Sequence, residues 1–180
     1  MITMRVTGSF APINLGRTVT RKIPNAMKAA LKAAKNVFLE GITREYYVKR
    51  GEVNKSIQAK TSAATTKYHT SYIKFTGKRL SLEHYKLTPK NRPKKPKVLR
   101  AAVRRDAGVK PLGRAFLYAP SGGSFKPFAR VGNPRLPIEK LVGPAIPQIA
   151  QWNEELHDEA IAAAEKIIKA ELFRLWREGR

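Results

Sequence analysis

Residues 148–178 read QIAQWNEELHDEAIAAAEKIIKAELFRLWRE and carry the longest helical pattern of this 180-residue chain. Apolar residues recur there every three or four positions, which is typical of a helix with a buried face. They form two overlapping stripes: Ile149, Trp152, Leu156, Ala160, Ala163 and Ile167, and Ile161, Ala164, Ile168, Leu172 and Leu175. The sequence therefore predicts one long C-terminal helix over residues 148–178.

The two stripes together cover more of this helix than one flat contact needs. Packing within the chain alone is one interpretation, and additional packing of this helix against a neighbouring subunit is the other. Acidic residues precede basic ones along the helix, which suits the helix dipole and leaves the helix nearly neutral. The residues expected in subunit packing are Trp152, Leu156, Ile161, Ile168, Leu172 and Leu175.

Residues 132–147, just before this helix, are rich in glycine and proline with apolar residues between them. Each proline fixes its φ angle near −65°, so we expect a stiff, ordered brace rather than a flexible linker. Such a brace would set the angle of the long helix against the rest of the fold.

Residues 61–131 show the two-residue period of β-strands. Ser71, Ile73 and Phe75 alternate with polar residues, and further candidate strands cover 98–105, 116–119 and 125–131. Residues 121–123, Ser-Gly-Gly, are expected to form the turn between the last two strands. The interruption at 86–97, KLTPKNRPKKPK, has too many prolines for a helix or a central strand and is expected to be an extended loop.

Residues 1–60 are expected to contain a strand and two helices. Ile2, Met4 and Val6 alternate like a short strand, and Pro24 is placed at the start of a helix whose apolar stripe runs from Met27 to Ile42. Residues 43–60 are expected to form a break and a second, short helix, marked by Val53 and Ile57 four positions apart. The overall prediction is a single α+β domain over 1–180, with N-terminal strand and helices, a small, mostly antiparallel sheet of four or five strands, and a long C-terminal helix.

The charge of the chain is strongly asymmetric. Lys and Arg number 36 against 13 Asp and Glu, a net charge of +23, of which residues 1–150 carry +25 and residues 151–180 carry −2. A region this basic repels itself unless an anionic surface lies beside it, so nucleic acid, an acidic protein surface and an anionic membrane are the classes of partner to consider. The apolar stretches are far too short to cross a bilayer.

The densest basic cluster lies in the 86–97 loop and the strand that follows it. Its expected contacts to an anionic partner are Lys90, Arg92, Lys94, Lys95, Lys97, Arg100, Arg104 and Arg105. Such a cluster binds phosphates by charge without reading sequence, and few aromatic residues are interleaved for base stacking. An acidic protein surface, a DNA backbone and a merely solvated loop remain the three interpretations.

Groups that carry catalysis are sparse. The chain has no cysteine and three scattered histidines, and the six acids of residues 1–150 are isolated from one another. No phosphate-binding loop, dinucleotide fingerprint or nucleophile elbow occurs. We therefore expect no enzymatic activity, no metal and no cofactor.

The segment from Phe128 to Gln148 carries an unusual pattern. Its fixed positions are Arg130 and Gly132, then Arg135, Leu136, Pro137 and Ile138, then Leu141, Gly143, Pro144, Ile146 and Pro147. In this pattern the chain resembles the prophage minor tail protein Z family of tailed phages. The opening strand, the alanine-rich first helix, Ala115-Phe116 and the charged last helix follow in the order that the family shows.

This resemblance implies a structural virion protein, a minor tail or tail completion protein at the head-proximal end of the tail that takes part in head–tail joining. It would be made in the host cytoplasm and located in the tail or neck of the virion. The implied partners are other tail and neck proteins (tail tube or terminator, and connector), further copies in a homo-oligomeric ring, and, as an open alternative, the DNA backbone; no membrane is implied. The competing function is that of a non-specific basic nucleic-acid-binding protein.

Overall fold

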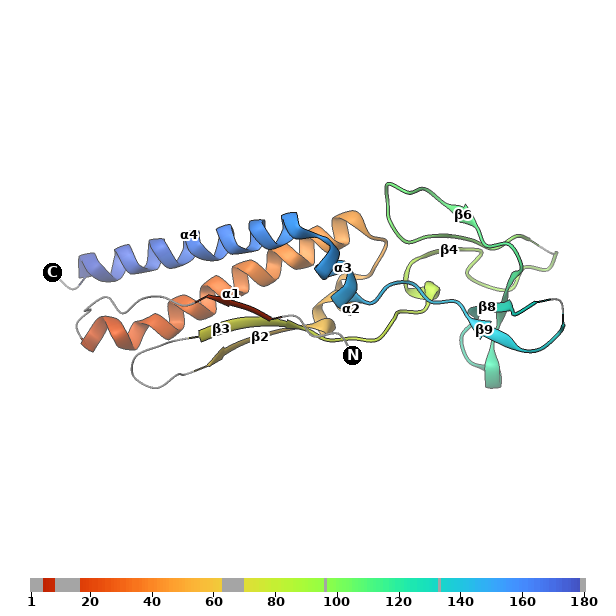
Figure 1. The fold of residues 1–180 in the computed structure, drawn as a ribbon, viewed down its shortest axis with the longest axis horizontal. Helices are drawn as coiled ribbons and strands as arrows, with labels where there is room; N and C mark the ends of the chain where they lie inside the picture. The colour runs from red at the N-terminus through yellow and green to blue at the C-terminus, as the bar shows by residue number, and fades with distance from the viewer. Residues whose placement is uncertain (1–4, 9–16, 63–69, 96, 133, 179–180) are drawn as a thin grey trace.

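The computed structural model describes residues 5–8, 17–62, 70–95, 97–132 and 134–178. In it the chain is elongated, with long helices at one end and a group of short strands at the other (Figure 1). The helices are α1 (Arg17–Glu45), α2 (Arg50–Ser56), α3 (Ile146–Trp152) and α4 (Glu154–Glu178). The strands are β1 (Arg5–Gly8), β2 (Ile57–Ser62), β3 (Thr70–Phe75), β4 (Lys86–Thr88), β5 (Arg100–Ala102), β6 (Lys110–Pro111), β7 (Ala115–Tyr118), β8 (Lys126–Arg130) and β9 (Ile138–Lys140).

The α+β class is as predicted, but the strands form three separate sheets rather than one of four or five strands. Each described sheet is antiparallel and has three strands, in the orders β1-β3-β2, β4-β5-β6 and β7-β8-β9. The two-residue pattern locates strands well, because Ile73 and Phe75 of β3 are buried as expected. It says nothing about which strands pair, since pairing depends on contacts between distant segments.

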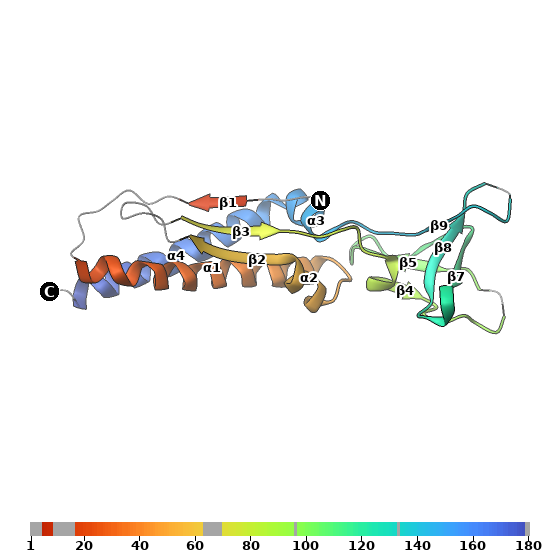
Figure 2. The ribbon, with the colours of Figure 1, turned by 90° about the horizontal axis from the view of Figure 1, so that it is seen from below.

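The helical part of the molecule consists of the four helices and the first sheet. Helix α1 lies between the sheet and α4, which runs alongside it (Figures 1 and 2). The ring of Phe38 on α1 shows this layering, because it meets the ring of Phe75 on β3 at 4.9 Å and that of His157 on α4 at 5.2 Å. The stripe from Met27 to Ile42 faces the core as predicted: Met27, Ala34, Phe38 and Ile42 are buried, and Leu31 is half-buried.

A glycine allows α1 and α4 to approach each other closely. A Cβ atom added at Gly41 would overlap the side chain of Leu156. Leu156 is almost fully buried, so the absence of a side chain on α1 provides the space that it fills. This role of Gly41 was not predicted from the sequence.

Several predicted boundaries were wrong. Helix α1 begins at Arg17, so Pro24 lies inside it: the φ angle of proline is itself helical, and the helix continues with one hydrogen bond fewer. The segment from Ile57 forms β2 instead of extending the short helix. The predicted loop at 86–97 begins with strand β4, and the predicted brace at 132–147 contains strand β9. Ile2 and Met4 lie outside the described residues.

The predicted single C-terminal helix is also two helices, α3 and α4, which are separated at Asn153. Asn153 has a non-helical backbone (φ −113°, ψ 84°), and its side-chain Oδ1 accepts a hydrogen bond from the backbone N–H of Leu156. Asparagine caps helices well in this way, so it ends α3 and begins α4. The apolar periodicity of the sequence continues across Asn153, so it did not indicate a break between two helices.

The β part, residues 82–140, is joined to the helical part at two places. At the first, the outgoing and returning chain segments pair: the N–H of Gly143 donates to Leu80 O (2.7 Å), and that of Leu82 donates to Leu141 O (3.2 Å). At the second, the end of α1 pairs with the loop after β5, where the N–H of Tyr47 donates to Val103 O (2.9 Å) and that of Arg105 to Glu45 O (2.8 Å). Among the described residues, buried side chains form one continuous cluster through both parts.

Candidate functional site

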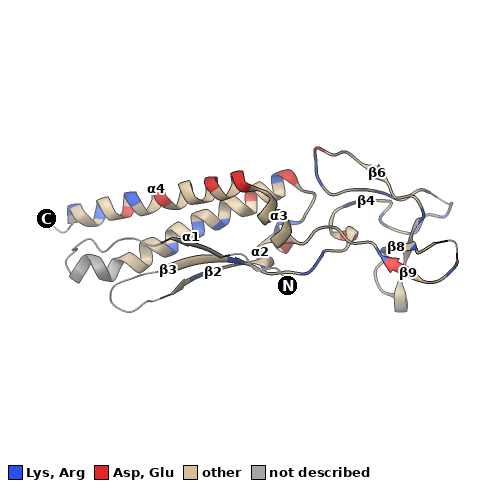
Figure 3. Cartoon of the chain, viewed as in Figure 1, with Lys and Arg blue, Asp and Glu red and all other residues tan. Residues whose placement is uncertain are grey.

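The basic cluster lies on the β part. In Figure 3, Lys and Arg are spread over this end of the molecule, whereas Asp and Glu gather on the first half of α4. All eight predicted contact residues are exposed. Residues 76–145 hold 17 Lys and Arg against three acids, Glu83, Asp106 and Glu139.

Two of the eight predicted residues are engaged with the chain itself. The guanidinium of Arg104 forms a bidentate pair with Asp106, with Nε–Oδ1 at 3.0 Å and Nη2–Oδ2 at 2.7 Å. Arg105 donates from Nε to Thr43 O (3.3 Å), and its guanidinium lies 4.7 Å from the ring centroid of Tyr47. Arg105 therefore helps to fasten the β part to α1, and the guanidinium of Arg104 lies 6.0 Å from the ring centroid of Tyr46, which follows α1 directly.

The other six residues define what we call the basic tip: Lys90, Arg92, Lys94, Lys95, Lys97 and Arg100. Within the described part of the chain, none of the six forms an ion pair. In both ribbon views the segment after β4 lies at the end of the molecule away from α4 (Figures 1 and 2). The basic tip is thus a projecting surface whose charge no ion pair among the described residues neutralises.

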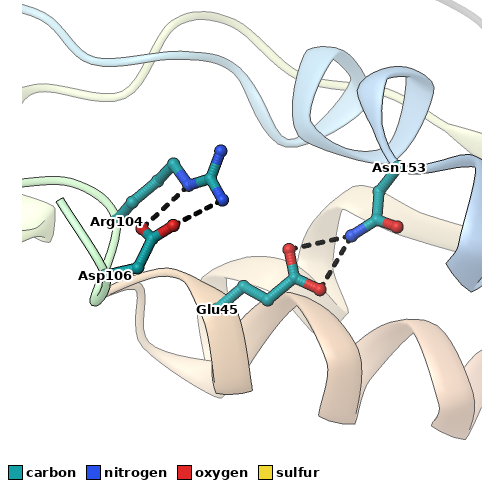
Figure 4. A network of polar contacts seen from close by, with 4 residues as sticks. All are labelled: Glu45, Arg104, Asp106 and Asn153. Carbon is teal, nitrogen blue, oxygen red and sulfur yellow. Dashed lines mark hydrogen bonds and ion pairs between the residues drawn. The ribbon is translucent and has the colours of Figure 1, made fainter.

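A cleft of about 1140 Å³ separates the two joints between the parts. Its helical wall includes Glu45, Glu154 and Glu155, and its other wall includes Arg104 and Lys110. In Figure 4, the Arg104–Asp106 pair lies on one side, facing Glu45 and Asn153 on the other. Asn153 Nδ2 lies 2.8 Å from both carboxylate oxygens of Glu45 and donates to them.

The tyrosines near this cleft are structural groups that the sequence analysis did not identify. Burial raises the pKa of Tyr46; the guanidinium of Arg104 opposes this shift, and Glu45 and Asp106 add to it. Burial also raises the pKa of Tyr85, whose hydroxyl donates to Pro144 O at 2.7 Å. Both hydroxyls are therefore held in the neutral form. The Tyr46-Tyr47 pair at the end of the first helical stripe was the signal available in the sequence.

The motif segment divides into an exposed half and a packed half. Arg130, Gly132, Arg135, Leu136 and Pro137 are exposed, and Gly132 has a φ angle of +81° that favours glycine. Ile138 is half-buried on β9.

In the packed half, Gly143, Ile146 and Pro147 are buried, and Leu141 and Pro144 are half-buried. A Cβ atom on Gly143 would lie 2.6 Å from Cε2 of Tyr85. The second half of the motif therefore fixes the return of the chain from the β part into α3, in the place where the brace was expected.

The six residues expected in subunit packing do not share one environment. Leu156 and Leu175 are buried within the chain (1% and 3% exposed), so no other subunit can contact them, and Ile168 and Leu172 are half-buried. Trp152 and Ile161 are exposed, at 64% and 44%. Phe173 and Trp176, which were not proposed, are exposed as well, with their ring centroids 6.0 Å apart.

Other chemistry has little support in the described residues. They contain no group of three or more His, Asp or Glu side chains placed to hold a metal ion. Among the described helices, none combines the length and the apolar character that crossing a membrane requires. Comparisons with protein-family models, curated proteins and solved structures found no match to this chain.

Proposed function

We propose that this chain is a structural virion protein of a tailed phage: a minor tail or tail completion protein that acts at the head-proximal end of the tail and takes part in head–tail joining. The observation that carries the proposal is the basic tip, six exposed cations without an ion-pair partner at one end of an elongated body. Exposed cations of this kind are suited to binding an anionic surface of a partner. The pattern from Arg130 to Pro147 supports the phage assignment, because it resembles the tail protein family described above.

The proposed mechanism is mechanical. The basic tip contacts an acidic surface of the connector or tail tube, or the DNA that passes through the neck. The packed half of the motif holds the β part against α3, because Gly143, Tyr85 and the paired segments at 80–82 and 141–143 fix this junction. Force on the tip is thereby transmitted to the helices. We propose no catalytic step and no cofactor, and place the protein in the tail or neck of the virion.

Charge reversal of the basic tip in a phage that encodes this chain tests the proposal. We expect the triple change Lys94→Glu, Lys95→Glu and Lys97→Glu to give DNA-filled heads and free tails that do not join, counted by electron microscopy of lysates. Virus titre should fall by several orders of magnitude. The matched control is Lys28→Glu, Lys32→Glu and Lys49→Glu, which removes the same charge from exposed positions of the helical part and should leave joining intact. Normal joining in the tip variant would refute the proposal.

The same six cations also favour a second function, non-specific binding of nucleic acid. Phosphate contacts release counterions, so the logarithm of duplex affinity would fall against the logarithm of salt concentration with a slope of about −0.9 per contact. Tight, strongly salt-dependent duplex binding by the isolated monomer, with joining unaffected in the tip variant, would favour this alternative.

A further inference from the structure

The start of α4 and the end of α3 carry an exposed acidic surface, of which Trp152, Glu154 and Glu155 also line the cleft opposite Arg104 and Lys110. We call this surface the acidic face and define it by four carboxylates and two large apolar side chains: Glu154, Glu155, Asp158, Glu159, Trp152 and Ile161. In the described part of the chain none of the four carboxylates forms an ion pair. Residues four apart lie one above the other on a helix, so Glu154 with Asp158 and Glu155 with Glu159 form two adjacent rows.

Favourable interaction with the helix dipole explains only part of this surface. The dipole acts within the first turn and so accounts for Glu154 and Glu155, but not for Asp158 and Glu159. It also does not account for Trp152 and Ile161, which remain 64% and 44% exposed beside these carboxylates. An exposed tryptophan with a charged rim is the arrangement found at protein–protein interfaces.

The surface that complements this face is on the same chain. The basic tip offers six exposed cations without an ion-pair partner, and residues 1–150 contain only six acids, none of them in a comparable cluster. The tip and the acidic face lie in different regions of the elongated molecule (Figures 1 and 3). Each surface can therefore be neutralised by a second molecule but not by the other surface of its own chain.

We infer that the acidic face of α4 binds the basic tip of a second copy of this chain, with Trp152 and Ile161 at the centre of the contact. The inference rests on the proposed function and narrows it: the acidic surface that the basic tip meets is that of a second copy, so joining depends on this assembly rather than on direct contact of the tip with the connector, the tube or DNA. Because the two surfaces are different, the contact is heterologous: each copy can bind one neighbour through its tip and another through its acidic face. Such contacts repeat and close into a ring when the rotation permits.

A charge-swap experiment on the full chain tests this interface. The tip variant is Lys94→Glu, Lys95→Glu and Lys97→Glu; the face variant is Glu155→Lys, Asp158→Lys and Glu159→Lys. Association is measured by sedimentation velocity at low and moderate NaCl concentration, and circular dichroism confirms that each variant folds. The unchanged chain should associate, and each variant alone should associate at least tenfold more weakly.

The mixture of the two variants gives the decisive result. An acidic tip matches a basic face, and a basic tip matches an acidic face, so a 1:1 mixture should regain the association that each variant lost. Trp152→Ala should weaken association at least tenfold without any change of charge. The control variant Lys28→Glu, Lys32→Glu and Lys49→Glu should associate like the unchanged chain.

Three results would overturn the inference: an unchanged chain that stays monomeric, variants that associate normally, or a mixture that stays dissociated. Binding of the basic tip to duplex DNA instead, with no self-association, would assign the tip to nucleic acid. The proposed function is tested separately, in the phage. If the mixture associates but the tip variant still joins heads to tails, the interface is supported and the joining role is refuted. If the mixture stays dissociated and the tip variant fails to join heads to tails, only the interface is refuted.

Discussion

At the scale of single residues, Gly143 is the position where side-chain size matters most for the junction of the two parts. Its N–H donates to Leu80 O, and the ring of Tyr85 occupies the space where a side chain would project. Tyr85 cannot easily move aside, because it is buried and its hydroxyl donates to Pro144 O. The absence of a Cβ is therefore a packing requirement here.

We expect Gly143→Ala to lower the free energy of unfolding by about 1–3 kcal/mol, the usual effect of overpacking a filled site. Urea denaturation monitored by circular dichroism measures this change. Gly113→Ala is the matched control, because no atom lies within 4 Å of the added Cβ, and its effect should stay within about 0.5 kcal/mol. Equal effects of the two changes would argue against the close approach to Tyr85.

At the scale of elements, the break between α3 and α4 determines where the carboxylates of the acidic face begin. Asn153 caps α4 through the N–H of Leu156 and ties this junction to the end of α1 through Glu45. The end of α1 in turn pairs with the loop after β5. One side chain therefore links α4, α1 and, indirectly, the β part.

We expect Asn153→Ala to lower the free energy of unfolding by about 2 kcal/mol, because it removes a helix cap and a hydrogen bond to a carboxylate. Asn153→Asp preserves the cap but places a second carboxylate against Glu45, so it should destabilise the fold too. Adding Glu45→Gln to Asn153→Asp should then restore more than half of the lost stability, as measured by thermal and urea unfolding. No recovery in this double variant would show that the Glu45 contact contributes little.

At the scale of the whole molecule, the chain carries a net charge of +23, with Lys and Arg spread along the described chain and Asp and Glu gathered on the first half of α4 (Figure 3). Self-repulsion of this size opposes the compact state and is screened by salt. The described core is nevertheless continuous through both parts, and it is what holds the charged β part against the helices.

Raising NaCl from about 20 mM to about 300 mM should therefore raise the melting temperature by about 2–4 °C, as expected for a gain near 1 kcal/mol in a chain of this length. Differential scanning calorimetry measures the shift. The variant Lys28→Glu, Lys32→Glu and Lys49→Glu lowers the net charge from +23 to +17 and should show a smaller shift. A melting temperature that is unchanged or falls with salt would mean that self-repulsion does not limit stability.

Much of the candidate site could be predicted from the sequence, because exposure of charged residues requires no knowledge of the fold. Lys90, Lys94 and Lys95 are exposed as expected, since lysines are almost never buried without a partner. The contacts of Arg104 and Arg105 could not be predicted. The pair of Arg104 with Asp106 depends on the backbone conformation of their loop, and the contact of Arg105 with Tyr47 depends on two distant segments coming together. The cleft could not be predicted either, because its walls come from segments that are distant in the sequence.

Local patterns alone were sufficient for the α+β class, the buried stripe of α1, the strand at Ile73 and Phe75, and the charge asymmetry. These features depend on the spacing of neighbouring residues, which can be read along the chain. Only the tertiary structure decided that the strands form three sheets, that the last helix breaks at Asn153, and which apolar residues of α4 remain exposed. Leu156 and Trp152 belong to the same stripe, yet one fills the space over Gly41 and the other faces solvent, because burial depends on what the rest of the chain brings to that side of the helix.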